Sequence, residues 1–400
     1  RCLLCCIVVR CVIDSLFLKV GATPEIYTLS VHDALPSAMA ADACETPVNG
    51  LGASVPAGEA WDVVGDALAG CGFARDGAPV VIGVTNDSIL PHMGVDSLTP
   101  LNELIKSYPG EIHPSRLIRD EWRIIAIINS VEGRQLMYRK DIFDKLGLKP
   151  PTSYGEILRV LYRIRMAGEM DTPWAEAYKT GADMGDTFVD IYLGMRGNLF
   201  LDGHDASIYN PRGVAALEMM QMLSSYAQPD FLSTDIGEVQ RRLADGEIAL
   251  AMLPSDRAPA LLDPSVSPMA HNIAVAPAPI AGVRPAAAMR WRGLSISADA
   301  TDEEAAEAFA AMMSAVDADM ANRNRQAANW LIDGHTARPA AQSMLDGAPV
   351  YPSGPQMSLL QQAIADGVEP FLIGGQDPSA ALLDIELVYK KAAKAGGLVN

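Results

Sequence analysis

From residue 136 to residue 164 the pattern of apolar and polar positions predicts a strand, a short helix, a break and a second helix. Gly147 can adopt the left-handed conformation that ends a helix, and Pro150–Pro151 prevents the first helix from continuing. Ser153 and Glu156 have the spacing of a capping box, which predicts the start of the second helix. Such punctuation is typical of a soluble α/β protein. The apolar face of the second helix consists of Ile157, Leu158, Leu161 and Ile164.

Other helix-start signals and apolar runs continue this alternation along the chain. Asn210 before Pro211, and Asp377 before Pro378, each predict a helix start, because the first residue caps and proline suits the first turn. A second capping box predicts a helix from residue 301. The predicted strands are 78–84, 121–128, 247–253 and 272–277. Since 400 residues exceed one ordinary core, we expect two lobes.

The composition is that of a folded, acidic protein. The net charge at pH 7 is −18, with 20% charged and 6% aromatic residues. A face that binds nucleic acid must neutralise phosphates with Lys and Arg, so this charge argues against a nucleic-acid partner. It also disfavours binding to an anionic membrane surface.

Cysteine and histidine give no sign of a metal site. All six cysteines lie in the first 71 residues, and no Cys-x-x-Cys pair is followed by a second ligand pair. The histidines are scattered and form no helical pair, so we expect neither a metal nor a cofactor. The cysteines are Cys2, Cys5, Cys6, Cys11, Cys44 and Cys71, and the histidines are His32, His92, His113, His204, His271 and His335.

The first 37 residues differ from the rest of the chain. Cys2–Ile13 is apolar and resembles the core of a secretion signal, but Arg10 leaves it short of the roughly 18 residues of a membrane-spanning helix. Pro24–Pro36 resembles translated sequencing-adapter sequence, and Ala38–Ala40 has the small-x-small pattern of a signal-peptidase site. We therefore expect residues 1–37 to be a non-native segment or a leader.

Five short segments carry a resemblance to a known family. They are Leu98–Ile105 (LTPLNELI), Tyr138–Asp141 (YRKD), Leu243–Met252 (LADGEIALAM), Asn272–Pro277 (NIAVAP) and Gly354–Ser358 (GPQMS). In these motifs the chain resembles the extracellular solute-binding proteins of ABC importers, in the sugar-binding family that includes maltose-binding protein. The resemblance covers about residues 78–400 and lacks the family's opening strand and helix, so the N-terminal part of the fold is expected to be either truncated or replaced by residues 38–77.

This resemblance implies an α/β fold of the two-lobe periplasmic-binding-protein type, in which hinge strands link two mostly parallel sheets flanked by helices. It places an N-lobe at 38–130 and 285–336, and a C-lobe at 131–284 and 337–400. The implied function is capture of a sugar or polyol by lobe closure, followed by delivery to an ABC transporter permease. A periplasmic or otherwise extracytoplasmic monomer is therefore expected.

Positions in the family pattern imply several ligand-binding side chains in the cleft. Asn86 and Asp87 follow a strand where relatives place sugar-contacting groups, although they also suit an Asx-turn. Asn129, Glu132 and Arg134 lie on the hinge-proximal strand just before the YRKD motif, where a simple bulge is the alternative. Acids, amides and Arg pair well with sugar hydroxyls.

Aromatic rings pack against the C–H side of a sugar, which makes tryptophans a second class of candidates. Core packing is the alternative for each of these tryptophans.

Asp256 and Arg257 follow the LADGEIALAM strand where relatives carry a Trp, and a surface ion pair would explain them equally. Leu359–Gln361 replaces an aromatic residue after GPQMS, which favours a small sugar or polyol over a maltodextrin. The remaining candidates are Trp174, Asp183, Trp291, Trp330 and Arg338.

Two other functions remain open at this point. A glycosidase would need two carboxylates about 5–10 Å apart across a bond, and no spacing in the sequence indicates such a pair. Motifs for a nucleophile elbow, a phosphate-binding loop or a dinucleotide site are also missing from the sequence. A sensor subunit that binds the same solute without transport would carry the same motifs.

Overall fold

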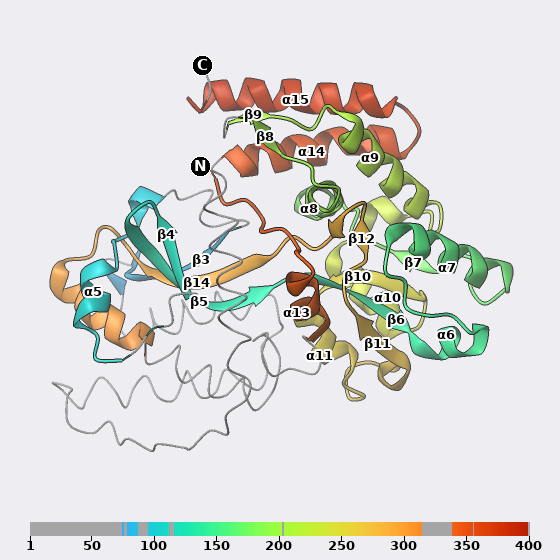
Figure 1. Ribbon diagram of the computed structural model, residues 1–400, viewed down its shortest axis with the longest axis horizontal. Helices are drawn as coiled ribbons and strands as arrows, with labels where there is room; N and C mark the ends of the chain where they lie inside the picture. The colour runs from blue at the N-terminus through green and yellow to red at the C-terminus, as the bar shows by residue number, and fades with distance from the viewer. Residues whose placement is uncertain are drawn as a thin grey trace. The chain divides into compact units, whose positions relative to one another are not determined.

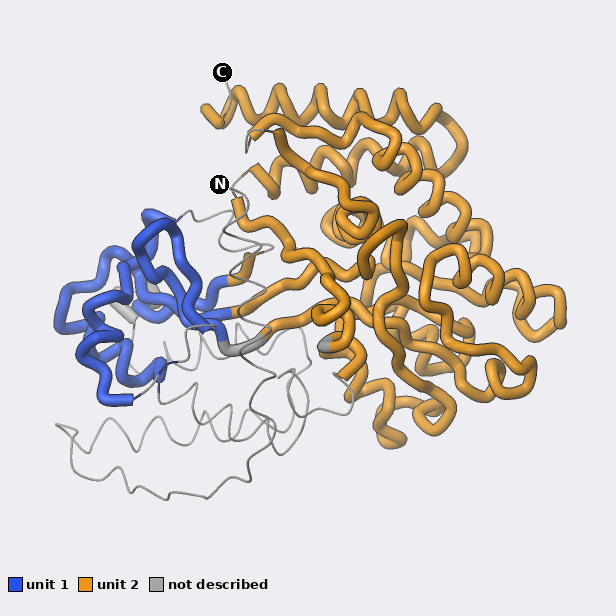
Figure 2. The backbone as a smooth tube through the Cα atoms, in the orientation of Figure 1, with its two compact units in different colours: residues 1–84, 95–129, 293–319 blue, residues 85–94, 130–292, 320–400 orange. Residues whose placement is uncertain are grey.

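The computed structural model describes residues 74–75, 78–86, 95–110, 112, 116–201, 204–313, 338–354 and 356–398. The chain forms two compact units (Figure 2). Unit 1 comprises residues 1–84, 95–129 and 293–319, and unit 2 comprises residues 85–94, 130–292 and 320–400. The chain changes unit at residues 129–130, next to the predicted lobe boundary, and again at 292–293, eight residues beyond the predicted one.

Unit 1 is built on a sheet with strand order β3-β14-β5-β4 (Figure 1). Buried Val and Ile side chains make its strands, and β4 and β5 pair antiparallel with a register shift after Ile118. Asn102 begins the helix α5 and fixes it to the sheet, since its side-chain oxygen accepts a hydrogen bond from Ile124 N at 2.9 Å. Residues 302–313 are also helical. The elements are β1 (Ala74–Arg75), β2 (Ala78–Pro79), β3 (Val81–Thr85), α5 (Asn102–Ser107), β4 (Leu117–Asp120), β5 (Arg123–Glu132) and β14 (Arg290–Ile296).

Two of these strands continue beyond unit 1. β5 runs on to Glu132, and β14 begins at Arg290, so each strand has one end in unit 2. Only Gly133 separates β5 from β6 (Arg134–Arg139), the next strand of unit 2. The crossing strands therefore deliver charged side chains to the edge of the unit 2 sheet.

The sheet of unit 2 has the order β11-β6-β10-β7 and corrects one expectation. β6 pairs antiparallel with both β10 (Leu250–Pro254) and β11 (Ile273–Ala276), and only the pairing of β10 with β7 (Trp174–Ala175) is parallel. The expectation of a mostly parallel sheet was therefore wrong for this unit. The reason is that β6 enters directly from β5, whereas β10 and β11 run in the opposite direction, toward residue 134.

The helices of unit 2 begin where the capping signals predicted. Ser153 accepts a hydrogen bond from Glu156 N, Asn210 from Arg212 N, and Asp377 from Ser379 N. Gly147 ends its helix with φ of 60°. These helices are α6 (Lys140–Leu146), α7 (Tyr154–Met166), α8 (Ala182–Gly194), α9 (Pro211–Ser224), α10 (Ile236–Ala244), α11 (Ala258–Leu261), α13 (Arg338–Leu345), α14 (Gln356–Leu372) and α15 (Pro378–Ala395). Short hairpins join β8 (Phe200–Leu201) to β9 (Asp205–Ala206) and β12 (Ile280–Ala281) to β13 (Arg284–Pro285).

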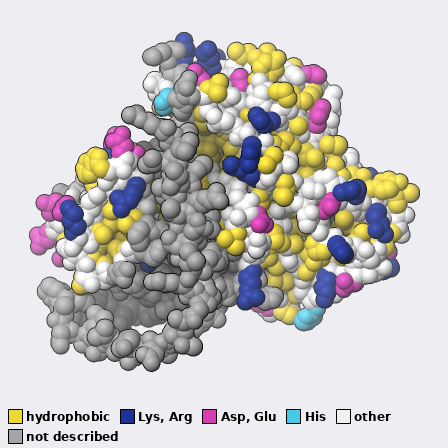
Figure 3. Space-filling model, in the orientation of Figure 1, with side chains coloured by type: hydrophobic (Ala, Val, Ile, Leu, Met, Phe, Trp, Pro, Cys, Tyr) yellow, Lys and Arg dark blue, Asp and Glu magenta, His cyan; other side chains and the backbone are white. Residues whose placement is uncertain are grey.

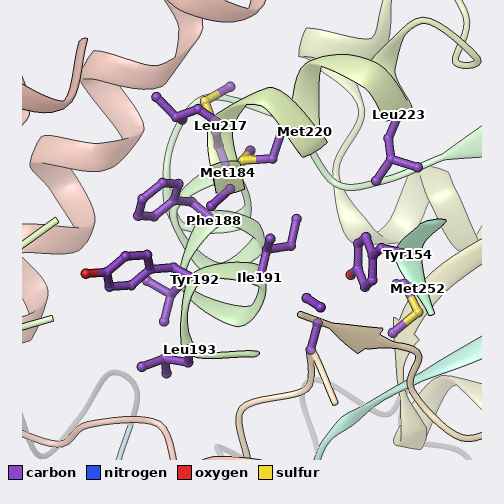
Figure 4. Close-up of a cluster of buried hydrophobic side chains, with 14 of the residues drawn as sticks. Tyr154, Met184, Phe188, Ile191, Tyr192, Leu193, Leu217, Met220, Leu223 and Met252 are labelled. Atoms are coloured by element: carbon purple, nitrogen blue, oxygen red, sulfur yellow. The ribbon is translucent and has the colours of Figure 1, made fainter. Parts of the chain in front are cut away.

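Helix α8 is the centre of the main core of unit 2. Apolar side chains from other elements surround this helix (Figure 4). On the helix itself, the rings of Phe188 and Tyr192 stack with their centroids 5.6 Å apart. Helix α14 packs against α8 and, on its other side, against α15 (Figure 1). A Cβ on Gly185 would lie 2.8 Å from Cγ of Gln361, so this glycine permits the close approach of α8 and α14. Thr187 and Asp190 are buried polar exceptions on α8, and they lead to the site.

Candidate functional site

A pocket of about 180 Å³ lies entirely within unit 2, at the ends of the crossing strands. Every polar side chain that lines it is charged, with four arginines and three carboxylic acids. The rest of the lining is Gly133, Ile236 and Pro254, so the described lining contains no aromatic ring. The charged residues are Glu132, Arg134, Asp186, Asp256, Arg257, Arg290 and Arg292.

Strand geometry explains how these side chains converge. Arg290 and Arg292 are two positions apart on β14 and so belong to the same face of the strand. Arg134 begins β6 opposite Pro254, the last residue of β10. A hydrogen bond of 3.0 Å from Ser255 N to Gly133 O then turns the chain into a short 3-10 helix, Ser255–Arg257. The crossing strands, β6, α8 and the 3-10 helix that follows β10 thus all contribute charge to one place.

The inner wall of the pocket is a buried ion network. Arg134 contacts Glu176 at 2.6 Å and Asp190 at 3.0 Å, and all three side chains are at most 5% exposed. Arg290 contacts Asp190 at 3.5 Å and Asp186 at 3.1 Å. Each guanidinium therefore faces two carboxyl groups. Burial of such charges is favourable only where each is paired and hydrogen-bonded, and this network largely meets that condition.

Helix α14 and Tyr351 hold the network in place from behind. Asp186 accepts hydrogen bonds from Tyr351 Oη at 2.9 Å and from Gln361 Nε2 at 2.8 Å. The guanidinium of Arg290 lies over the Tyr351 ring, 4.3 Å from its centroid. These contacts fix the orientation of both Asp186 and Arg290 toward the pocket.

The outer wall is paired more loosely. Arg292 Nη2 lies 3.0 Å from Glu132 and 4.0 Å from Asp256, so two acids share one guanidinium nitrogen. Arg257 Nε lies 3.8 Å from Asp256 Oδ1, beyond hydrogen-bond distance, and Arg257 Nη1 donates to Gln240 at 3.3 Å. Both Arg257 Nε and Asp256 Oδ1 are buried and have no hydrogen-bond partner among the described residues. An adjacent donor and acceptor are thus left open beside the pocket.

Burial weakens the acidity of several carboxyl groups here. It raises the pKa of Glu176 from 4.5 to about 7, against the attraction of Arg134. It also raises the pKa of Asp190, against Arg290 and Arg134, and the pKa of Asp256, against Arg292 and Arg257. These three carboxyl groups therefore hold protons more readily than free carboxyl groups do.

Four of the residues expected from the sequence meet at this pocket. They are Glu132, Arg134, Asp256 and Arg257. Asp186, Arg290 and Arg292 were not expected from the sequence. A signal was present for each of them, because Arg290 and Arg292 flank the selected tryptophan, and Asp186 and Asp190 form an i,i+4 acid pair in a mostly apolar helix.

The other candidates described by the structure lie outside the lining of the pocket. Asn86 is fully buried, where its side chain accepts from Trp291 N at 2.8 Å and donates to Tyr351 O at 2.8 Å. Trp174 is fully buried in β7, and Trp291 is 8% exposed between the two lining arginines of β14. Asp183 lies at the start of α8, and burial raises its pKa.

Arg338 is exposed at the start of α13. Asp87, Trp330 and the side chain of Asn129 lie outside the described residues. Ligand binding by any of the sequence-selected residues stays a prediction.

Two further observations concern the surface and the helices of the described part of the chain. On the face of unit 2 in Figure 3, Lys and Arg side chains are spread among hydrophobic and acidic ones rather than gathered in one patch. Of the helices in the described part of the chain, none has the length and apolar character needed to cross a membrane.

Comparison with known proteins supplies the context for this site. Residues 97–320 match the family model described as bacterial extracellular solute-binding protein. No curated protein sequence matches the chain.

Many solved structures share the fold, at low sequence identity. An ABC transporter solute-binding protein from Agrobacterium radiobacter K84 in complex with ribitol is 17% identical, with a TM-score of 0.67 over 78% of this chain and 85% of that one. Maltose-bound MalE3 of T. maritima is 18% identical, with a TM-score of 0.67 over 78% and 84%. UgpB from Mycobacterium tuberculosis with glycerophosphocholine is 16% identical, with a TM-score of 0.63 over 86% and 90%.

These similarities confirm the two-lobe periplasmic-binding-protein fold that the motifs predicted. The family match covers more than half of the 400 residues. The chain belongs to the bacterial extracellular solute-binding protein family.

Proposed function

We propose that this solute-binding protein captures a sugar or polyol in the charged pocket of unit 2 and delivers it to the permease of an ABC importer. The observation that carries the ligand class is the open pair formed by Asp256 Oδ1 and Arg257 Nε, 3.8 Å apart and both buried. A hydroxyl group both donates and accepts, so one ligand hydroxyl would satisfy both atoms. A ligand rich in hydroxyls is the chemistry that fits such a pair.

The energetics of the pair support the same ligand class. A buried donor or acceptor without a partner costs about 1–3 kcal/mol. A ligand hydroxyl that enters the pocket would recover much of this cost at two atoms together. The carboxylates of Glu132 and Asp186 would accept from further hydroxyls, because charged acceptors make the stronger hydrogen bonds.

The described lining favours a small ligand. It contains no aromatic ring on which a sugar ring could stack, whereas stacking on aromatic faces is how longer oligosaccharides gain affinity. Solved structures of similar fold hold ribitol, D-mannitol and α-D-tagatose, which are small polyols or sugars. We infer a monosaccharide or polyol for this protein as well.

Transport would follow from closure of the two lobes over the solute. The strands β5 and β14 pass from one unit to the other, and Gly133 directly follows one of them. Gly133 has no side chain to restrict its backbone dihedral angles, which suits a position where the chain bends. The closed monomer would then bind the permease outside the cytoplasmic membrane, in the periplasm of a cell with two membranes.

Thermal unfolding with a panel of sugars and polyols tests the proposal. A ligand at about 100 times its Kd adds about 2.7 kcal/mol to the free energy of unfolding, which raises Tm by a few degrees. We expect such a shift with at least one panel member, and a loss of at least tenfold in its affinity in Asp256→Ala. Glu218→Ala, an exposed change on α9, is the matched control and should leave the shift intact.

The same samples distinguish binding from catalysis. Chromatography of the mixtures should recover each sugar unchanged. The appearance of hydrolysis products would instead assign the acids of the pocket to a glycosidase and contradict the proposal.

A further inference from the structure

We propose that the solute carries an anionic group, a carboxylate or a phosphate, and that Arg257 and Arg292 bind it. This inference rests on the proposed function and narrows its ligand to an acidic sugar or an acidic polyol. The arginines of the two walls of the pocket differ in how closely carboxyl groups pair with them.

The two arginines of the inner wall are already paired with carboxyl groups of the protein. Arg134 and Arg290 together meet three carboxyl groups, those of Glu176, Asp186 and Asp190, at distances of 2.6–3.5 Å. Arg290 also stacks on Tyr351 and donates to Ala288 O at 3.0 Å. These two guanidiniums are held by the protein itself, so the inner wall has little positive charge left for a ligand.

The arginines of the outer wall are not paired in the same way. Arg257 and Arg292 face Glu132 and Asp256, and both of these acids converge on one nitrogen of Arg292. Arg292 is thus closely paired, whereas the carboxylate that Arg257 meets, that of Asp256, lies 3.8 Å away. The guanidinium of Arg257 is therefore the less fully paired of the two.

Arg257 is the more available of the two guanidiniums. Its side chain is 25% exposed and lines the pocket, and its contact with Asp256 is 3.8 Å long. A guanidinium presents a planar fork that matches the two oxygens of a carboxylate or phosphate, and its charge is permanent. An anionic ligand group would pair with the exposed part of this guanidinium.

Calorimetric titration with matched ligand pairs tests the inference. The pairs are D-gluconate with D-glucitol, D-galactonate with galactitol, D-glucuronate with D-glucose, and glycerol 3-phosphate with glycerol. Within a pair the two ligands differ mainly in one charged group. We expect the acidic member of at least one pair to bind at least tenfold more tightly than its neutral partner. Its affinity should fall between 50 mM and 500 mM NaCl, and which pair responds identifies carboxylate or phosphate.

The possible failures are distinct. If neutral members bind and their acidic partners bind no better, the proposed function stands and the anionic ligand is overturned. If no member of the panel binds, the sugar or polyol ligand is overturned as well. Binding of the acidic member that does not weaken with salt contradicts a role for the two arginines.

Variants of Arg257 and Arg292 test whether these residues cause the preference for acidic ligands. Arg257→Gln and Arg292→Gln should each reduce the ratio of acidic to neutral affinity at least tenfold, whereas Arg257→Lys, which keeps the charge, should retain most of it. Arg159→Gln is the matched control, because Arg159 is 74% exposed on α7 and outside the lining of the pocket. Circular dichroism confirms folding of each variant. An unchanged ratio in both glutamine variants would overturn the assignment of these arginines.

Discussion

At the scale of single residues, the same side-chain types serve the core and the pocket of this protein. The sequence singled out Arg134, and the structure surrounds it with Glu176 and Asp190 while one side of it lines the pocket. Asn86 was selected at a strand end, yet its amide is fully used in hydrogen bonds to backbone atoms. Trp174 is core. The sequence indicated that these polar and aromatic residues lie in or next to strands. It did not indicate which face of the strand each side chain would occupy.

Replacing Arg134 should be among the most destabilising changes in unit 2. Arg134→Met leaves Glu176 and Asp190 buried without their shared partner, and breaking a buried ion pair in this way costs about 3–5 kcal/mol. Urea denaturation gives the free energy of unfolding. The control, Arg159→Met on the exposed face of α7, should change it by less than about 0.5 kcal/mol. Equal losses in the two variants would show that the network contributes little to stability.

Glu176 should make the stability of the protein depend on pH near neutrality. Burial raises its pKa from 4.5 to about 7 in the folded chain, so the folded state keeps a proton that the unfolded state releases above about pH 4.5. Its contribution to stability is fully present below that pH and is lost as the pH rises through 7. The loss is on the order of 3 kcal/mol.

Glu176→Gln removes this titration and retains an oxygen that can accept from Arg134. Chemical denaturation from pH 5 to pH 8 should therefore show a smaller fall in unfolding free energy for the variant than for the native chain. Parallel pH profiles of the two proteins would mean that Glu176 is already ionised throughout this range.

At the scale of elements, local signals predicted helix ends well and strand direction poorly. Capping residues such as Ser153 and Asn210 act through bonds to their own neighbours, so the sequence contains the whole interaction. Strand direction in unit 2 depends instead on β6 entering from β5 of the other unit. That connection is long-range, and no local pattern records it. The convergence of β14, β10 and α8 on one pocket also depends on long-range contacts, so it could not be predicted from the sequence.

At Gly293 the strand β14 lies close to the backbone of β5. A Cβ there would lie 2.8 Å from Ile127 O and 3.1 Å from Ile127 C, both backbone atoms that cannot turn away. Gly293→Ala should therefore lower the free energy of unfolding by about 1–3 kcal/mol through overpacking. Thermal unfolding measures the change.

Gly155→Ala is the matched control for this variant. Gly155 lies in the first turn of α7, and a Cβ there meets nothing within 4 Å. Alanine should stabilise that position by about 0.4–1 kcal/mol, because the unfolded chain loses freedom. If both variants shifted stability in the same direction, steric closeness at Gly293 would not be the cause.

At the scale of the whole molecule, the pocket and the crossing strands suggest that binding and motion are coupled. Unit 2 contains the complete described lining of the pocket, so a solute bound there would be held by residues of this unit. Three of the lining residues lie near the ends of strands that continue into unit 1. They are Glu132 at the end of β5, and Arg290 and Arg292 near the start of β14. A solute that contacts them therefore acts directly on the segments about which the lobes would turn.

Solute binding should consequently make the protein more compact. Closure requires that the ligand bind the closed form more tightly than the open one, since only a difference in affinity shifts the populations. Small-angle X-ray scattering should show a lower radius of gyration after addition of D-glucitol or D-gluconate, whichever calorimetry finds to bind more tightly. Asp256→Ala, whose binding is expected to be impaired, should show no change at the same ligand concentration. Saturation by calorimetry with an unchanged radius of gyration would contradict closure and leave a binding protein that recognises its solute without moving its lobes.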